Sequence, residues 1–117
     1  MQVVTVWYIV LKLTEAQFQK QIVELAQYYR WLVAHFRPAW NKKGDKCRTP
    51  VQADGAGYPD LCMVKEGRII FAEVKSEGGV VSSDQWKWLT VLESSQKCEV
   101  YIWYPRDWES IKNILTR

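Results

Sequence analysis

Residues 57–85 read GYPDLCMVKEGRIIFAEVKSEGGVVSSDQ, and this stretch predicts the centre of the fold. Two short runs rich in strand-forming residues, 61–65 and 68–75, flank the dipeptide Glu66-Gly67. This pattern is typical of a β-hairpin. The rest of the chain is interpreted around that hairpin.

The second strand of the hairpin changes character along its length. It is apolar on both faces up to Ala72, which predicts a central strand of a sheet. It then carries Glu73 and Lys75, and the period of two places both side chains on one face. A carboxylate and an ammonium group at the end of a core strand are costly unless they are paired or bind something.

Asp60 begins the first hairpin strand, and Glu73 ends the second. Antiparallel pairing brings these ends together, so both carboxylates can reach one hard cation such as Mg²⁺, with the backbone carbonyl of Val74 as a further ligand. Lys75 would then steady an attacking water or the developing negative charge. The competing interpretation is a structural Glu73–Lys75 ion pair, with Asp60 as a turn residue.

The flanking sequence predicts a mixed α/β sheet covered by helices. Thr14 with Gln17, and Ser82 with Gln85, match the capping-box pattern of helix starts. The helix after Ser82 is expected to carry Trp86, Leu89 and Leu92 on one side, with Trp88 and Val91 flanking, and Asp107 is expected to cap the last helix. The expected elements are a strand at 3–11, a helix at 15–29, a strand at 32–37, the hairpin, a helix to about Glu93, a strand at 98–104 and a C-terminal helix.

Composition and length predict one cytoplasmic domain over residues 1–117. No apolar run approaches the roughly 18 residues that a membrane span needs, and residues 1–12 do not resemble a signal peptide. The cysteines are odd in number and widely spaced, which predicts reduced thiols rather than a zinc site. The single histidine, His35, is interpreted as structural or exposed rather than catalytic.

Positive charge gathers between residues 30 and 48, where six basic residues face one acidic residue. Trp31, Phe36 and Trp40 lie among these charges, a mixture suited to a phosphate backbone with bases for stacking. A solvated basic loop is an equally weighted alternative. The segment 40–57 is also longer than most loops and predicts either function or disorder. The expected nucleic-acid-binding residues are Arg37, Lys42, Lys43, Lys46 and Arg48.

Three segments in order, GYPD, IIFAEVKSE and SSDQWKWL, resemble the VRR-NUC group within the PD-(D/E)xK nuclease superfamily. The resemblance extends from about Leu13 to Trp108, and small phage and bacterial stand-alone members are the most similar in length. It implies a restriction-endonuclease-like αβββαβ core, to which the strand at 3–11 and the C-terminal helix are additions. It also implies hydrolysis of DNA phosphodiester bonds with Mg²⁺ or Mn²⁺, on branched substrates such as Holliday junctions and flaps.

The resemblance also implies roles for individual residues. Asp60 and Glu73 match the metal ligands, and Lys75 matches the catalytic lysine. Gln85 matches the glutamine that opens the helix after the catalytic strand, although as a capping residue it needs no function. Glu15 matches the acidic residue of the first helix, and Gln19, one turn later, is the rival for that place.

Some features depart from the family pattern. Arg30 stands where relatives usually have a glycine that ends the first helix, and the loop from Trp40 to Ala56 is longer than in compact members. The segment Val3–Leu11 has no recognised counterpart and is expected to add an edge strand or to pair across a dimer. The prediction is therefore a homodimeric DNA endonuclease without a small-molecule cofactor, in a bacterial or phage-infected cell. The alternatives are a non-catalytic nucleic-acid-binding module of the same fold and a nuclease acting on RNA.

Overall fold

The computed structural model describes residues 13–36, 39–40, 46–47 and 52–117. In chain order the elements are α2 (Glu15–Tyr28), β1 (Leu32–His35), β2 (Ala39–Trp40), β3 (Lys46–Cys47), β4 (Leu61–Lys65), β5 (Arg68–Val74), α3 (Ser83–Ser94), β6 (Glu99–Trp103), the 3₁₀ turn η1 (Pro105–Asp107) and α4 (Trp108–Thr116).

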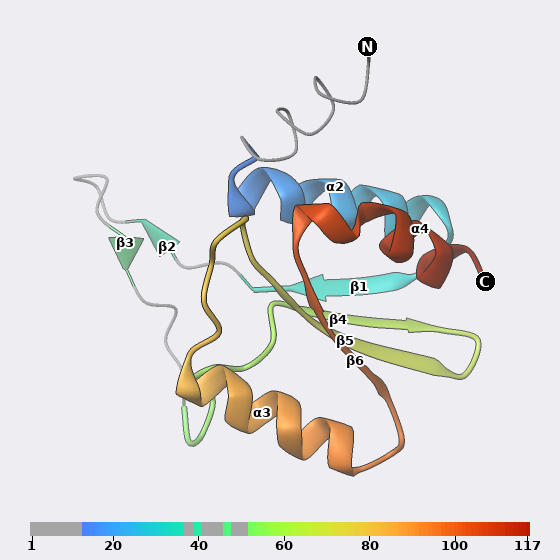
Figure 1. The fold of residues 1–117 in the computed structure, drawn as a ribbon. Coiled ribbons are helices and arrows are strands. Elements are labelled where there is room, and N and C mark those ends of the chain that lie inside the picture. Colours follow the sequence, from blue (N-terminus) through green and yellow to red (C-terminus); the bar gives the residue numbers. More distant parts are fainter. Residues whose placement is uncertain (1–12, 37–38, 41–45, 48–51) are drawn as a thin grey trace.

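Four of these strands form one mixed sheet in the order β1-β4-β5-β6. β4 pairs antiparallel with both β1 and β5, whereas β5 and β6 run parallel. Figure 1 shows α2 and α4 together on one side of this sheet and α3 on the other side. The expected mixed α/β fold with a central hairpin and a C-terminal helix is confirmed. The expected strand at 3–11 lies outside the described residues.

The two faces of β5 differ as its alternation predicts. Ile70, Ala72 and Val74 are completely buried and belong to the core that Phe18 and Ile22 of α2 also line. Burying each large apolar side chain of this kind contributes roughly 1.5–3 kcal/mol. A slip of the strand by one residue would expose the whole apolar set. The core therefore holds the register that turns Glu73 toward the opposite side, where α3 lies.

The segment between residues 40 and 57, for which the sequence predicts only a loop, takes part in a short strand pair. β2 and β3 run antiparallel, with Ala39 opposite Cys47 and Trp40 opposite Lys46. The loop prediction is wrong at these positions. A pair of two-residue strands is too short to leave a periodic pattern in the sequence.

The structure adds detail to two expectations about helix residues. Trp86, expected on the same side of α3 as Leu89, is 52% exposed, whereas Leu89 is 4% exposed. Among the strands of the sheet, α3 packs chiefly on β6, so only a narrow stripe of the helix is covered. Asp107 is the N-cap residue of α4, as expected, but its side chain makes no capping hydrogen bond to that helix. Its Oδ2 instead accepts the Tyr104 N–H at 2.8 Å and closes the 3₁₀ turn.

The described helices include none that is long and apolar enough to cross a membrane. Cys62 and Cys98, two of the three cysteines, are free thiols in the part of the chain that the structure describes.

Helix α2 ends in a left-handed turn at Arg30. Arg30 has a φ of 71°. Its N–H donates to Gln27 O at 3.0 Å, and the Trp31 N–H donates to Ala26 O at 3.0 Å. This pair of bonds is the Schellman arrangement, whose left-handed residue is usually glycine because a Cβ is strained there. The helix therefore ends where expected, with strain at an exposed arginine.

Replacing Arg30 by glycine is expected to raise the free energy of unfolding by about 1 kcal/mol, because the left-handed conformation costs an L-residue about that much. Thermal unfolding followed by circular dichroism would measure the change. Arg30→Ala is the matched control, since it removes the same charge but keeps the Cβ. Equal stability of the two variants would contradict the prediction.

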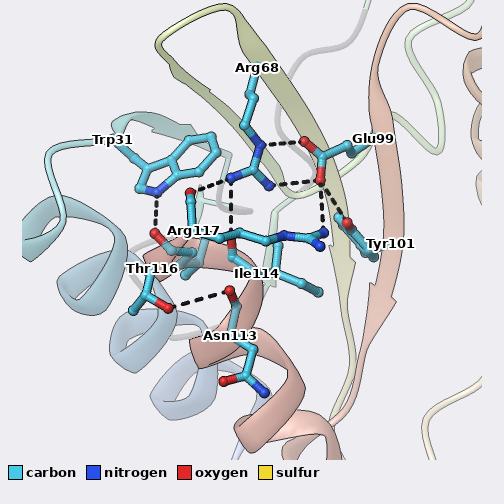
Figure 2. A network of polar contacts seen from close by, with 9 residues as sticks. Trp31, Arg68, Glu99, Tyr101, Asn113, Ile114, Thr116 and Arg117 are labelled. Carbon is cyan, nitrogen blue, oxygen red and sulfur yellow. Dashed lines mark hydrogen bonds and ion pairs between the residues drawn. The ribbon is translucent and has the colours of Figure 1, made fainter.

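A polar network joins the C-terminal end of α4 to the sheet (Figure 2). Arg68 of β5 makes two hydrogen bonds with the Glu99 carboxylate, from Nε at 2.7 Å and from Nη2 at 2.8 Å. Its Nη1 donates to the carbonyls of Ile114 at 3.2 Å and Arg117 at 2.8 Å. The Trp31 indole donates to Leu115 O at 2.9 Å. These bonds satisfy carbonyl groups that a helix end leaves unpaired.

Glu99→Gln is expected to lower the free energy of unfolding by about 1 kcal/mol at neutral pH, a modest value because solvent partly screens the pair. The Arg68 hydrogen bond holds the pKa of Glu99 below its ordinary value, and Tyr101 adds to this effect. A lowered folded-state pKa gives stability that is present above the unfolded-state pKa and is lost as the pH falls through the folded value. The difference between parent and variant should therefore shrink in acid.

Urea unfolding at neutral pH and in acid tests this pH dependence. Glu109→Gln is the control, because Glu109 pairs with Lys112 on the surface, where its side chain is 82% exposed. A Glu99→Gln effect of the same size at both pH values would contradict the assignment.

Candidate active site

The hairpin brings the carboxyl groups of Asp60 and Glu73 to one end of the sheet. Leu61 lies opposite Ala72, so the residues just beyond this pair, Asp60 and Glu73, are neighbours. Asp60 Oδ2 accepts the backbone N–H of Val74 at 2.8 Å. The Asp60 carboxylate is thus held against the end of β5 by the backbone of the same strand that presents Glu73.

Glu73 is a buried carboxyl group whose partners cover only one of its oxygens. It is 1% exposed. Gln85 Nε2 donates to Oε1 at 2.9 Å, and Lys75 Nζ lies 3.6 Å from the same oxygen. Oε2 is buried and has no hydrogen-bond partner among the described residues. A buried acceptor without a donor is rare and indicates a site for a ligand or water.

The electrostatics of this end of the sheet favour a proton on Glu73. Burial raises the pKa of Glu73 to about 9. The neighbouring Asp60 carboxyl contributes to this raised pKa, because a proton on Glu73 can be shared with Asp60 and because the Asp60 charge opposes ionisation of Glu73. The Lys75 ammonium opposes the shift, and the charge of Glu15 supports it. Without a bound cation, a second negative charge at this end of the sheet is therefore unfavourable, even with the Lys75 ammonium group nearby.

Gln85 has both of the positions that the sequence leaves open: it caps α3, and it lies beside the candidate active site. Its Oε1 accepts the Ser82 N–H at 2.8 Å, and its own N–H donates to Ser82 Oγ at 3.2 Å, which completes the capping box of α3. Its Nε2 also reaches Glu73. One amide group therefore caps the helix and orients the buried carboxyl group.

Gly57 fixes the distance between the loop before β4 and the start of α3. It has a φ of 81°, and a Cβ at this position would lie 2.4 Å from the Asp84 carbonyl carbon and 2.7 Å from Gln85 N. The backbones touch because Gly57 has no side chain. Sequence reasoning assigned no role to this residue, although a glycine three residues before Asp60 was the available signal.

Residues of α2 approach the same end of the sheet. The predicted capping box at Thr14 is present and starts the helix at Glu15. Glu15 is exposed at the surface, and its charge acts on Glu73, as the pKa of Glu73 shows. Gln19 is 7% exposed, and its Nε2 has no hydrogen-bond partner among the described residues. Glu15, through its charge, and Gln19, through the amide donor at Nε2, therefore both remain candidates for the first-helix residue of the site.

Most of the expected nucleic-acid-binding residues lie outside the described residues: Arg37, Lys42, Lys43 and Arg48. Lys46 is described only as part of the backbone of β3. His35 is exposed at the end of the edge strand β1. The predicted basic surface therefore stays a prediction.

The donor set suits a hard divalent cation with an incomplete protein shell. Among the described residues, no group of three or more His, Cys, Asp or Glu side chains could hold a metal ion. Mg²⁺, however, is often bound by only one or two carboxylates together with waters and substrate phosphate. Asp60 and Glu73 supply two carboxylates, and Glu73 Oε2 lacks a partner. These residues fit Mg²⁺ or Mn²⁺.

Comparison with known proteins gives one match. A family model described as the VRR-NUC domain matches residues 13–106, which include both carboxylates, Lys75 and Gln85. No curated protein and no solved structure matches the chain.

Proposed function

The chain belongs to the VRR-NUC domain family, and from this premise we propose that it is a divalent-metal-dependent endonuclease that cuts DNA. The family is one of PD-(D/E)xK-type nucleases. The finer proposal is that the substrate is branched DNA, such as a Holliday junction or a flap. The proposed products carry 5′-phosphate and 3′-hydroxyl ends.

The observation that carries the proposal is the unpartnered Oε2 of Glu73 beside the Asp60 carboxyl group. Burial of Glu73, together with the neighbouring Asp60 carboxyl group, raises the pKa of Glu73. A divalent cation between the two carboxyl groups would reverse this effect and favour both charged forms. The backbone carbonyl of Val74 is proposed as a further ligand. The arrangement therefore suits metal binding better than a simple structural ion pair.

The neighbouring side chains have separate proposed roles. Gln85 holds Glu73 in one orientation through its amide hydrogen bond, and the Val74 N–H does the same for Asp60. Lys75 is buried beside Glu73, where its ammonium group can stabilise the charge that develops on the phosphate. A bound divalent ion would lower the pKa of a water molecule and neutralise the phosphate. Glu15, or else Gln19, would orient that water.

The surroundings of the site are proposed to hold the substrate and a second subunit. Arg37, Lys42, Lys43, Lys46 and Arg48 would bind the DNA backbone. A homodimer would present two sites, as cutting both strands of a junction requires, and the segment Val3–Leu11 is the proposed contact. The free thiols of Cys62 and Cys98 support a cytoplasmic location.

The direct test is cleavage of a radiolabelled four-way junction, a flap and a linear duplex of the same sequence with Mg²⁺ or Mn²⁺. We expect cleavage of the branched substrates and little cleavage of the duplex. Single-stranded RNA and an RNA–DNA hybrid are included in the same series. Preferential cleavage of either one would identify an RNA-directed nuclease instead. Tight junction binding without cleavage under either ion would overturn the proposal in favour of a non-catalytic binding module.

A further inference from the structure

A depression of about 330 Å³ lies between α3 and the segment that leads into β4. Figure 1 shows this segment passing the first turn of α3. Its volume is near the lower end of the roughly 300–1,000 Å³ range of small-ligand pockets. Trp88 and Val91 supply apolar surface, and the small residues Ala53 and Ala56 complete the wall. Three residues of the lining are charged: Asp54, Asp84 and Lys87.

Two contacts fix the orientation of the Trp88 side chain, which forms the aromatic wall of the depression. The Trp88 indole Nε1 donates to Asp54 O at 2.9 Å. Its ring also makes an edge-to-face contact with Tyr58, with 5.0 Å between the ring centroids. The indole cannot turn without losing both contacts. A fixed aromatic surface of this kind can stack a planar ring at little cost in conformational entropy.

The depression adjoins the candidate active site. Asp84, which lines it, immediately precedes Gln85, whose amide group contacts Glu73. The backbone of Asp84 also abuts Gly57, three residues before Asp60. A group bound in the depression would therefore lie beside the end of the sheet that carries the two carboxyl groups.

Asp84 and Lys87, two of the three charged residues that line the depression, are available for a ligand. The side chains of Asp84 and Lys87 make no hydrogen bond or ion pair with any other residue of the described chain. A carboxylate accepts hydrogen bonds from the amino and imino groups of a base edge, and an ammonium group binds phosphate. The Trp88 indole can stack on the face of a base, and Asp84 can accept hydrogen bonds from the edge of that base. Lys87 can bind the adjoining phosphate.

On the basis of the proposed function, we propose that this depression receives one unpaired nucleobase next to the phosphate that is cut. The base stacks on Trp88, its edge faces Asp84, and Lys87 lies near the adjoining phosphate. A base in a perfect duplex must first be unpaired and unstacked, whereas a base at a branch is more easily displaced. The depression thereby contributes to selection of branched DNA.

Filling the depression tests the proposal while leaving Trp88, Asp84 and Lys87, the three residues proposed to contact the nucleotide, unchanged. Val91 is 61% exposed, so Val91→Trp places a large side chain in the opening at little expected cost to the fold. Thr90→Trp is the matched control, because it adds the same side chain to an exposed position of α3 that does not line the depression. Thermal unfolding of both variants checks that they fold.

Binding is measured without cleavage, on the full chain with Glu73→Gln as background, using a six-nucleotide single strand and its abasic counterpart. We expect the indole N–H resonance of Trp88 to shift with the intact strand only, since stacking requires a base. Val91→Trp should weaken binding of the intact strand by about tenfold, in line with the contribution of one stacked base, and Thr90→Trp should not. A strand bound equally well by Val91→Trp, or an equal shift with the abasic strand, would overturn the proposal.

The test of the nucleobase site and the test of nuclease activity can give different results. A chain that binds the base but cuts no DNA would retain this inference and lose the nuclease assignment. A chain that cuts junctions equally well with and without Val91→Trp, in the cleavage-competent background, would lose only this inference.

Discussion

Replacing Glu73 by glutamine is expected to abolish DNA cleavage and, at the same time, to stabilise the metal-free protein. Loss of a carboxylate that holds the metal should reduce the cleavage rate by about 1,000-fold or more. Glutamine keeps the size of the side chain and an oxygen for the Gln85 amide, which now lies 2.9 Å from Glu73 Oε1. The variant should therefore fold as the parent does.

The gain in stability follows from the raised pKa of Glu73. The ordinary value is 4.5, and burial raises the folded-state pKa to about 9. Between these values the folded protein holds a proton that the unfolded chain releases, so the stability of the parent falls as the pH rises through this window. Glutamine has no proton to lose. Its advantage should grow with pH and reach roughly 1–2 kcal/mol near neutrality, a magnitude typical of relieving one poorly paired buried group.

Thermal unfolding across this pH window in the presence of a chelator measures the difference. Glu24→Gln is a suitable control, because Glu24 is exposed on α2. Added Mg²⁺ should raise the melting temperature of the parent in a concentration-dependent way but not that of the Glu73 variant, since only a bound ligand stabilises by mass action. Undiminished cleavage by Glu73→Gln, or an unchanged slope of stability against pH, would show that the site is assigned wrongly.

Gly57→Ala is expected to have the second large effect, because it removes both stability and activity. The new Cβ would lie 2.4 Å from the Asp84 carbonyl carbon and 2.6 Å from its oxygen, so the loop or the first turn of α3 must move. Strain at a positive φ costs roughly 1–2 kcal/mol, and overpacking costs roughly 1–3 kcal/mol more. The displaced turn carries Gln85, so the contact between Gln85 and Glu73 should be disturbed and cleavage reduced.

Gly67→Ala separates the two causes. Gly67 also has a φ of 81°, but a Cβ there would meet nothing within 4 Å. It should lose only the smaller, conformational part of the stability and cleave DNA at the parental rate. Chemical unfolding and junction cleavage, measured for both variants, give the comparison. Equal losses for the two alanine variants would show that the close approach of Gly57 to α3 has no structural importance.

Much of the fold could be predicted because the information is local. Thr14 with Gln17 and Ser82 with Gln85 mark helix starts within four residues, and both capping boxes are present. The alternation along β5 likewise predicts which side chains are buried. What could not be predicted is of another kind. The exposure of Trp86 depends on how much of the sheet α3 covers, and no local pattern carries that information.

The sequence by itself determined the helices and the strands of the main sheet, the central hairpin and the meeting of Asp60 with Glu73, since strand pairing and the period of two follow from neighbouring residues. Only the tertiary structure decided the state of that site. Gln85 reaches Glu73 from another element, Gly57 lets two backbones touch, and Oε2 of Glu73 is left without a partner. Burial and the approach of groups distant in the chain set the pKa of a carboxyl group, and both exist only once the chain has folded.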